Sequence, residues 1–359
     1  RSAIIKDSTS HSNIGIIYLP EFYAAFDDVN GRRSYLDVEK EVKKLMADKV
    51  DGIILDLRNN GGGSLYDVVQ MVGLFINQGP VVQVKDRNNR PTILKDNETG
   101  VLYSGPLAIL VNEFSASASE IFAAAIQDYG RGVIIGSTST YGKGTVQRNI
   151  GLDAKNGFTF GESELGTLKL TLQKFYRING GSTQLKGVES DIILPSQIET
   201  LKLREKDNED ALPYDEISKA SFQKWPASFD LKAIKHQSSE RLAHDSAFTI
   251  IKENSAWLSR QNDKSYSLNI DDYRNEKKEI KEKVSQIEAV MKLNNKLNVS
   301  LLPNEQNKYA EDKNKQERVK AWLNSLSEDI YLDQAVRVVD DMINMENVAK
   351  NSSSTITVH

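Results

Sequence analysis

Residues 50–58 read VDGIILDLR, and residues 59–63, NNGGG, follow them directly. A continuous apolar run of this length predicts a strand that is buried on both faces, as in a sheet covered by helices. Three successive glycines let backbone N–H groups approach a ligand closely, although such a triplet is more often a plain turn. This stretch therefore predicts a buried strand whose end is suited to a binding loop.

The segments around this strand extend the pattern in both directions. Short apolar runs at residues 14–19 and 107–111 alternate with helical patterns such as residues 36–47. Strands that alternate with helices indicate an α/β architecture. Beyond about residue 200 the chain becomes rich in lysine and glutamate and keeps a helical periodicity. We therefore expect an α/β core followed by a mainly α-helical C-terminal domain.

Three serines precede a predicted helix in residues 114–121, FSASASEI. The alanine-rich run after them has good helix propensity, so Ser115, Ser117 and Ser119 are all possible N-caps. Capping alone is the simpler interpretation of such a cluster. A helix N-terminus also presents free N–H groups to a developing oxyanion, so one of these serines is a candidate nucleophile as well.

A serine nucleophile here needs a base other than histidine. No histidine occurs between His11 and His236, and Lys143 stands between two glycines in the segment YGKGTVQ. Lysine can accept a proton if burial lowers its pKa from ~10.4 towards ~7–8. That shift of roughly 3 units corresponds to about 4 kcal/mol, a plausible cost for a buried amine. The residues therefore predict a hydrolase with a Ser/Lys dyad.

Four separately spaced motifs occur in order along the first half of the chain. They are residues 56–63 (DLRNNGGG), 115–120 (SASASE), 127–131 (QDYGR) and 142–147 (GKGTVQ), with further matches at 173–177, 179–184 and 210–213. Together they resemble the carboxy-terminal processing proteases, and most closely the tail-specific branch of the bacterial cell envelope. The resemblance runs from about residue 13 to about 215. It implies a crotonase-like ββα spiral for the protease core.

The resemblance also implies roles for individual residues. Ser117 matches the nucleophile, Lys143 the general base and Gln147 the residue that orients the lysine. The backbone N–H groups of Ala118 and Gly63 match the oxyanion hole. Gln147 lies four positions beyond Lys143, so a strand here places both on one face, and its amide oxygen accepts a hydrogen bond without adding charge. The family implies no cofactor and no metal, and the substrate-binding residues stay unknown.

The expected domain boundaries follow from the same resemblance. We expect residues 1–12 to be a linker from a missing PDZ and N-terminal region, and residues 13–200 to be the serine protease core. Residues 201–345 are expected to form the helical C-terminal domain, and residues 346–359 a flexible tail. The loop at residues 136–142 is one residue longer than the family's usual form. We therefore expect Lys143 to lie out of hydrogen-bond reach of Ser117 before substrate binds.

Composition removes several other classes of protein. The 359 residues contain no cysteine and carry a net charge of −4. The lack of cysteine excludes disulfides, thiol catalysis and cysteine zinc sites, and the mild charge argues against nucleic-acid binding. Gly144 stands where a phosphate-binding loop would place Ser or Thr, so the GKG segment does not predict a nucleotide site.

Three functions of different kinds are compatible with these observations. The first is an endopeptidase in the periplasm or cell envelope of a Gram-negative bacterium, acting on proteins or peptides with accessible C-terminal tails, with an envelope adaptor protein as a further expected partner. The second is a catalytically weak or inactive peptide-binding fragment that lacks its PDZ domain. The third is an acyl-CoA-processing enzyme, because a fold does not fix a function. The joint presence of Ser117, Lys143 and Gln147 favours the first.

Overall fold

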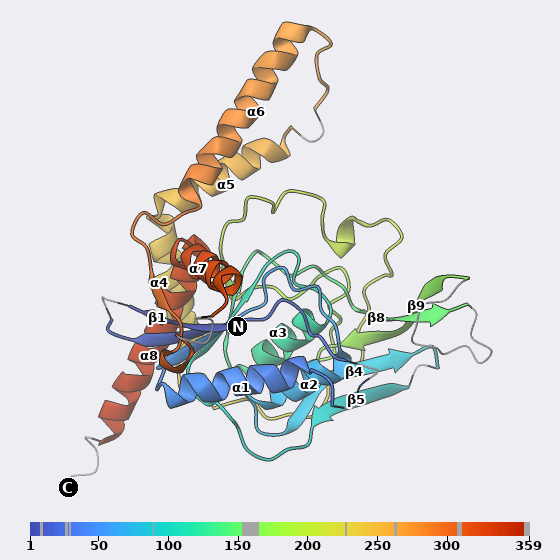
Figure 1. Cartoon of the computed structure of the whole chain (residues 1–359). Helices are drawn as coiled ribbons and strands as arrows, with labels where there is room; N and C mark the ends of the chain where they lie inside the picture. The colour runs from blue at the N-terminus through green and yellow to red at the C-terminus, as the bar shows by residue number, and fades with distance from the viewer. Residues whose placement is uncertain are drawn as a thin grey trace.

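The computed structural model describes residues 1–7, 10–25, 28, 30–88, 90–152, 165–226, 228–261, 264–306 and 311–354. Within this part of the chain, two β-sheets form the body, and helices pack on both faces of the larger one (Figure 1). The larger sheet has the strand order β10-β7-β6-β3-β2-β1-β11. Its strands are β1 (Ser2–Lys6), β2 (Asn13–Tyr18), β3 (Gly52–Asp56), β6 (Leu107–Val111), β7 (Val133–Gly136), β10 (Ile192–Ile193) and β11 (Asn298–Ser300).

The direction of the strands decides where the loops meet. Strands β2, β3, β6, β7 and β10 are parallel, whereas β1 is antiparallel to both β2 and β11. The carboxyl ends of β3, β6 and β7 therefore lie at one edge of the sheet. The loops that leave this edge, residues 57–64, 112–117 and 137–144, contain Gly63, Ser117 and Lys143, and the other predicted site residues, Ala118 and Gln147, lie within three residues of these loops. Ligands of open parallel sheets bind at this edge.

Side chains of the central strands alternate between two hydrophobic clusters, because successive residues of a strand point to opposite faces. Ile53 and Leu55 of β3 belong to one cluster and Ile54 to the other, and all five residues of β3 are buried. This is the structure that the apolar run at residues 50–58 predicts. Each fully buried aliphatic side chain stabilises the fold by roughly 1.5–3 kcal/mol.

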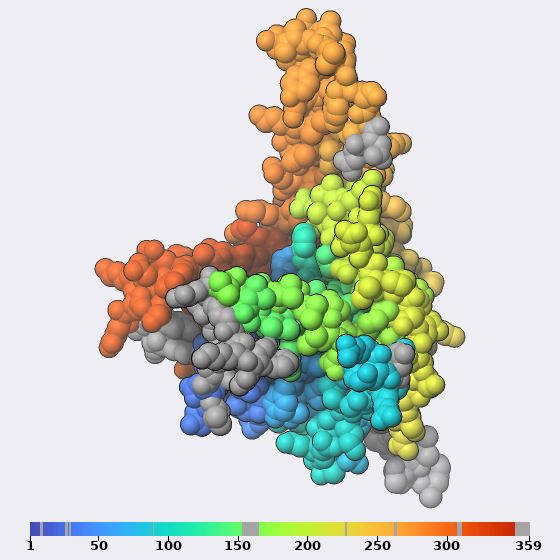
Figure 2. Space-filling model, turned by 90° about the vertical axis from the view of Figure 1, so that its right-hand side faces the viewer, coloured from blue at the N-terminus to red at the C-terminus, as the bar shows by residue number. Residues whose placement is uncertain are grey.

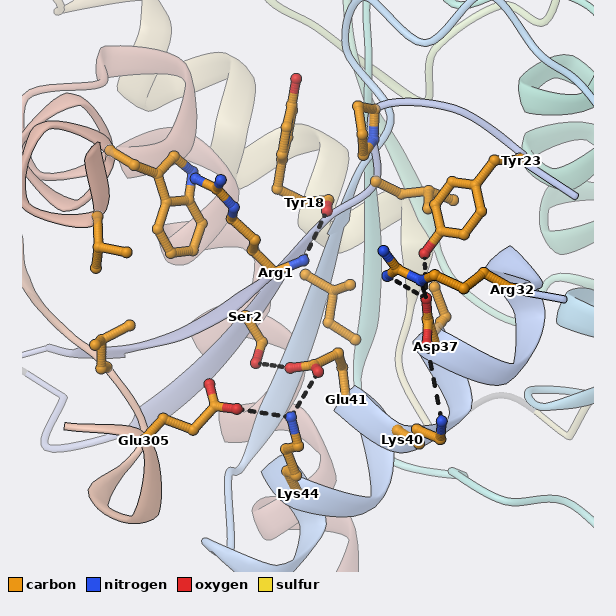
Figure 3. Close-up of a pocket in the computed structure, with 17 residues that line it drawn as sticks. Arg1, Ser2, Tyr18, Tyr23, Arg32, Asp37, Lys40, Glu41, Lys44 and Glu305 are labelled. Atoms are coloured by element: carbon orange, nitrogen blue, oxygen red, sulfur yellow. Dashed lines mark hydrogen bonds and ion pairs between the residues drawn. The ribbon is translucent and has the colours of Figure 1, made fainter. Parts of the chain in front are cut away.

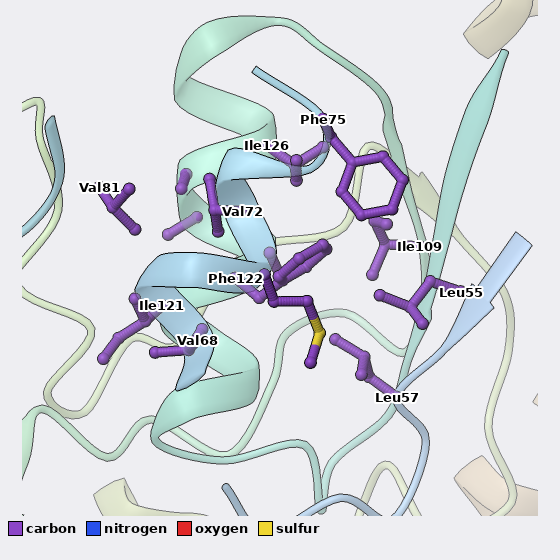
Figure 4. Packing of buried hydrophobic residues seen from close by; sticks show 14 of the residues in the cluster. Leu55, Leu57, Val68, Val72, Phe75, Val81, Ile109, Ile121, Phe122 and Ile126 are labelled. Atoms are coloured by element: carbon purple, nitrogen blue, oxygen red, sulfur yellow. The ribbon is translucent and has the colours of Figure 1, made fainter. Parts of the chain in front are cut away.

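Three helices from the first half of the chain cover one face of the large sheet. They are α1 (Ser34–Ala47), α2 (Leu65–Gly73) and α3 (Ala118–Tyr129). Figure 4 shows Val72 of α2 and Phe122 of α3 packed with Leu55 and Ile109 of the sheet. The ring of Phe122 also meets Phe75 edge-on at 5.9 Å between centroids. These contacts hold the N-terminus of α3 in place, next to the carboxyl edge of the strands.

The opposite face of the sheet is covered by the C-terminal half of the chain. The helices there are α4 (Leu231–Ala243), α5 (Ser246–Ser259), α6 (Ile270–Val290), α7 (Lys313–Ser327) and α8 (Ile330–Ser354), with short 3-10 turns at η1 (Glu205–Asp207) and η2 (Pro303–Glu305). A Cβ atom on Gly52 of β3 would lie 2.3 Å from Val339 Cγ1 of α8. Helix α8 therefore packs directly on the strand backbone and forms one layer of a three-layer core.

The smaller sheet is antiparallel and carries the base predicted from the sequence. Its order is β5-β4-β9-β8, from β4 (Gly79–Asp86), β5 (Pro91–Asp96), β8 (Thr145–Gly151) and β9 (Thr167–Tyr176). Strand β8 begins two residues after Lys143. Helices α5 and α6 pack against each other at the far side and project away from the body (Figures 1 and 2).

The predicted fold class, an α/β core followed by a mainly helical C-terminal part, is confirmed. At both ends of the chain the structure shows regular elements where a linker and a tail were expected. Residues 2–6, expected as a linker, form β1 between β2 and β11, because Ala3 and Ile5 bury their side chains in the core of the sheet. The segment expected as a tail from residue 346 continues α8 as far as Ser354. Residues 355–359 of that expected tail lie outside the described residues.

Candidate active site

The structure separates the three candidate serines by what their hydroxyls do. Ser115 Oγ donates to the Leu57 carbonyl at 2.8 Å, and Ser119 Oγ donates to the Asn60 carbonyl at 2.9 Å. Both serines are fully buried. Ser117 is partly exposed, and its hydroxyl donates to no acceptor among the described residues. Of the three, Ser117 therefore has the hydroxyl that is available for reaction.

The backbone of Ser117 is held in an unusual conformation. The residue is the N-cap of α3, with φ 57° and ψ −111°. A non-glycine residue with positive φ costs of order 1–3 kcal/mol and persists only where the surroundings fix it. Here the Glu120 carboxylate fixes it by accepting a hydrogen bond from Ser117 N at 2.8 Å. Such strain concentrates at functional sites, where it aims a side chain.

The glycine triplet lies directly against the candidate nucleophile. Gly62 has φ +105°, and a Cβ on it would lie 2.7 Å from Ser117 Cβ. Asn60 shapes the turn, because its Oδ1 accepts a hydrogen bond from Gly62 N at 2.9 Å. The N–H groups of Gly63 and Ala118 have no acceptor within the part of the chain that the structure describes. Two unpaired donors beside Ser117 can stabilise an oxyanion.

Lys143 and Gln147 contact each other, although Lys143 lies before β8 and the register of β8 with β9 shifts between Val146 and Gln147. Lys143 Nζ donates to Gln147 Oε1 at 3.0 Å, and Gln147 Nε2 in turn donates to Thr171 Oγ1 of β9 at 3.4 Å. Burial lowers the pKa of Lys143, and the nearby charge of Lys169 lowers it further. Both causes favour the neutral amine, which is the form that can accept a proton.

Ser117 and Lys143 are not hydrogen-bonded to each other through their side chains: among the described residues, Lys143 Nζ has Gln147 as its hydrogen-bond partner. The expectation drawn from the longer loop at residues 136–142, that Lys143 lies out of reach of Ser117 before substrate binds, stays a prediction. Lysine has four rotatable side-chain bonds, so the position of Nζ depends on the rotamer of this side chain. Catalytic hydrogen bonds are often long or unmade before substrate binds.

A buried carboxylate joins the two halves of the candidate site. Glu120 is fully buried, and its Oε2 accepts hydrogen bonds from Ser117 N at 2.8 Å and from Lys143 N at 3.0 Å. Its Oε1 accepts from Gly142 N and Thr140 Oγ1, both at 2.7 Å. Burial raises the pKa of Glu120 to about 8, and these four hydrogen bonds oppose the rise. One side chain thus fixes the backbone of both predicted catalytic residues.

Sequence reasoning missed several of these supporting residues. Glu120 ends the SASASE motif, but the sequence does not show that it bonds to the loop at residues 140–143. Thr171 supports Gln147, Thr183 Oγ1 donates to the Lys143 carbonyl at 2.9 Å, and Gln184 Oε1 accepts from Gly144 N at 2.8 Å. All three lie at least 24 positions from their partners. No local pattern in the sequence carries that information.

A cavity of about 430 Å³ lies elsewhere, between α1, β2 and the C-terminal region (Figure 3). Tyr23 and Arg32 bond to Asp37 on one wall, and Lys44 bonds to Glu305 on the other. None of the predicted site residues lines this cavity. Among the described residues, no cluster of His, Cys, Asp and Glu side chains could hold a metal ion. The same residues include no helix with the length and apolar character needed to cross a membrane.

Comparison with known proteins identifies the family. The model of peptidase family S41 matches residues 13–194. The chain belongs to peptidase family S41. The model of the C-terminal domain of tail-specific protease matches residues 198–344, directly after the peptidase region. The predicted relationship to carboxy-terminal processing proteases, with the tail-specific branch as the nearest, is therefore confirmed.

Individual relatives agree with this assignment to family S41. The chain is 45% identical over 216 residues to a tail-specific protease of Haemophilus influenzae, a match that covers 60% of this chain and 30% of that protein. It is 36% identical over 167 residues to a carboxy-terminal-processing protease of Bartonella bacilliformis, covering 45% of this chain and 36% of that one. The matches thus span about a third of the length of these relatives.

Solved structures with a similar fold include a photosystem II D1 C-terminal processing protease, with a TM-score of 0.43 and 24% identity. That similarity covers 54% of this chain and 47% of the other. Mature CPAF in complex with lactacystin gives a TM-score of 0.42 and 17% identity, over 54% of this chain and 50% of the other.

Proposed function

We propose that this chain is the catalytic part of a serine endopeptidase that cuts proteins after engaging their C-terminal tails. Ser117 is the nucleophile, Lys143 the general base and Gln147 the residue that orients the lysine. The N–H groups of Gly63 and Ala118 form the oxyanion hole. The observation that carries the proposal is the shared Glu120 carboxylate, whose Oε2 bonds the backbone of Ser117 at 2.8 Å and of Lys143 at 3.0 Å.

The proposed reaction follows from the chemistry of these groups. Neutral Lys143 takes the proton from Ser117 Oγ as the hydroxyl oxygen attacks the peptide carbonyl carbon. Negative charge moves to the carbonyl oxygen, where two N–H donors stabilise it; removing one such donor typically slows catalysis by ~10²–10³-fold. The lysine then gives its proton to the leaving amine, and water hydrolyses the acyl-enzyme by the same steps.

The relatives support the setting of this reaction as well. They carry the names tail-specific and carboxy-terminal-processing protease, so we propose protein or peptide substrates with accessible C-terminal tails. We also propose that the protein acts in the bacterial cell envelope, in the periplasm, with an adaptor protein as a further partner. No nucleic acid is expected, given the net charge of −4.

The test is proteolysis of a disordered protein such as casein, comparing the wild-type chain with Ser117→Ala and Ser119→Ala. Ser117→Ala should abolish cleavage and leave the melting temperature nearly unchanged, because its hydroxyl donates to no described residue. Ser119→Ala should keep much of the activity but lose about 1 kcal/mol of stability, because it removes a buried hydrogen bond to Asn60. Cleavage that persists in Ser117→Ala at the wild-type rate would refute the proposal.

A further inference from the structure

One ion pair joins the peptidase region to the helical C-terminal region close to the candidate site. Arg58, two residues after the end of β3, donates two side-chain hydrogen bonds to Asp56, from Nε at 2.9 Å and from Nη2 at 2.7 Å. Its Nη2 also lies 2.7 Å from Asp329 Oδ2. The exposed fractions of the three side chains are only 17%, 3% and 19%. The ion pair is therefore largely shielded from solvent, and salt screens such partly buried pairs much less than exposed ones.

Asp329 is anchored firmly on its own side of this contact. Its Oδ1 accepts hydrogen bonds from Tyr331 N at 2.9 Å and Leu332 N at 3.1 Å, so it caps the N-terminus of α8. Tyr331 Oη donates to the Pro195 carbonyl at 2.9 Å, which ties this end of the helix to the peptidase region. One carboxylate oxygen thus holds α8 and the other holds Arg58.

On the other side, Arg58 belongs to the segment that contacts the nucleophile. We call residues 57–63 the glycine loop. Asn59 and Asn112 exchange two hydrogen bonds of 2.9 Å, which join the glycine loop to the loop that follows β6. The Asn60 carbonyl accepts from Ala116 N at 3.0 Å, one residue before Ser117. Arg58 is therefore connected to Ser117 through a few covalent bonds and hydrogen bonds, so a displacement of Arg58 can displace Ser117.

The two regions pack closely just beyond Asp329, where Ile330 and Leu332 are buried in the shared core. On the other side of Asp329, a cavity of about 720 Å³ lies between the two regions, and Arg58, Asn59 and Asp329 are among the residues of its wall. At the wall of this cavity, the ion pair between Arg58 and Asp329 joins the peptidase region to the helical region with a defined geometry.

We propose that Asp329 is a positioning residue for the peptidase reaction: through Arg58 it holds the glycine loop in the arrangement that the reaction requires. The proposal rests on the proposed function of Ser117 and the oxyanion donors. Its consequence is that the helical C-terminal region takes part in setting the geometry of the active site, in addition to covering the sheet.

The decisive variant is Asp329→Asn. Asparagine caps helices as well as aspartate does, so α8 keeps its cap. Its amide nitrogen, however, presents donors to the donors of Arg58 and removes the negative charge. The matched control is Asp245→Asn, because Asp245 Oδ1 caps α5 in the same way, accepting from Ala247 N at 2.9 Å and Phe248 N at 3.4 Å. Asp245 lies in no part of the candidate site.

Kinetics on a disordered substrate should separate positioning from mere stability. We expect Asp329→Asn to lower kcat at least tenfold with KM within twofold of wild type, and Asp245→Asn to change neither. Arg58→Gln should lower kcat as well, and adding Asp329→Asn to it should lower kcat no further, because both changes break one link. Equal kcat in Asp329→Asn and wild type at matched melting temperatures would overturn the proposal.

Hydrogen exchange gives a second readout that needs no activity. Amides in residues 57–63 and 112–118 should exchange at least tenfold faster in Asp329→Asn than in wild type or Asp245→Asn. Unchanged exchange would overturn the link to the glycine loop, whatever the kinetics show. If Ser117→Ala cleaves as fast as wild type, the proposed function fails, while exchange still decides whether Asp329 holds the loop.

Discussion

At the scale of single residues, the candidate site depends on which polar groups are already occupied. The hydroxyls of Ser115 and Ser119 donate hydrogen bonds to the carbonyls of Leu57 and Asn60. These bonds join the glycine loop to the start of α3. Ser117 stands between them with a hydroxyl that donates to no described residue and with a strained backbone. Three identical side chains thus make different contacts, and the proposed nucleophile is the one whose hydroxyl donates to no described acceptor.

The same scale governs the pH dependence of the proposed base. Lys143 must be neutral to accept a proton, so activity should rise with pH through its pKa, which burial and then the charge of Lys169 lower. Lys169→Glu replaces a repelling charge by an attracting one and should move this rise to higher pH. Lys320→Glu, an equal charge change on the exposed side of α7, is the control and should leave the profile in place.

Lys143→Arg tests the same assignment directly. Guanidinium does not lose its proton in proteins, so this variant should be as inactive as Lys143→Ala. The measurement for all of these variants is kcat/KM between pH 5 and 10. A Lys143→Arg enzyme with near wild-type turnover would exclude lysine as the general base.

At the scale of elements, Glu120 decides how the N-terminus of α3 meets the loop before β8. The carboxylate carries four hydrogen bonds, of which three come from backbone N–H groups. Backbone N–H groups cannot turn away as side chains can, and when buried each needs an acceptor. Both oxygens of Glu120 are therefore required as acceptors. The glycines at 142 and 144 let this loop approach closely, and Gly142 has φ +98°. Helix, loop and strand are therefore positioned as one unit around a single buried side chain.

Replacing Glu120 by glutamine should change the relative positions of the start of α3 and the loop before β8, while the rest of the fold stays intact. If the amide oxygen keeps the bonds from Ser117 N and Lys143 N, the amide nitrogen faces Gly142 N and Thr140 Oγ1. A buried donor without an acceptor costs about 1–3 kcal/mol. We expect kcat/KM to fall roughly tenfold to hundredfold, since each 1.4 kcal/mol is a factor of ten. Glu113→Gln is the matched control, because Glu113 is also buried but lies outside the site. Equal losses of activity in the two variants would contradict the assignment.

The same variant should change how stability depends on pH. Burial raises the pKa of Glu120 to about 8 in the folded protein, above its ordinary value of 4.5. The folded state then binds more protons than the unfolded state between these values, so this group's contribution to stability falls as pH rises from about 4.5 through 8. Urea unfolding across this range should show that fall in the wild type, and Glu120→Gln should remove it.

At the scale of the whole molecule, the peptidase and helical regions share one sheet and one core. Strand β11, from the second region, pairs with β1, and α8 packs on β3 and β6. The cluster on that face combines Ile14, Ile54 and Leu110 of the sheet with Val336 and Val339 of α8. The two regions that the family models match in sequence are thus not independent in structure.

A chain that ends at residue 200 should therefore fail to fold on its own. It would expose one complete apolar face of the seven-stranded sheet, which soluble monomers rarely do, and would leave β1 without its outer partner. We expect aggregation in size-exclusion chromatography and no cooperative thermal unfolding. A monomeric, cooperatively unfolding peptide of residues 1–200 would show that α8 and β11 are dispensable for the core.

The sequence alone determined the elements whose signals are local. The buried strand at residues 52–56 follows from a continuous apolar run, and the helix that begins at Ala118 follows from an alanine-rich run after possible caps. The choice of Lys143 as the proposed base follows from the lack of a suitably placed histidine. The contact of Lys143 with Gln147 joins residues four positions apart, although Lys143 lies before β8 and outside the strand from which the contact was expected. The strand, the helix and the contact between Lys143 and Gln147 each depend on residues at most a few positions apart.

Features that depend on distant partners became visible in the folded protein alone. Glu120 meets Gly142 across 22 positions of sequence, β1 pairs with β11, and Arg58 meets Asp329. A short strand such as residues 2–6 has too few residues for its period to be told from that of a linker. Hydrogen bonding between distant segments decides which serine hydroxyl has no described acceptor, and packing decides which helix covers the second face of the sheet. The local periodicity of a sequence does not show which distant segment an element will contact.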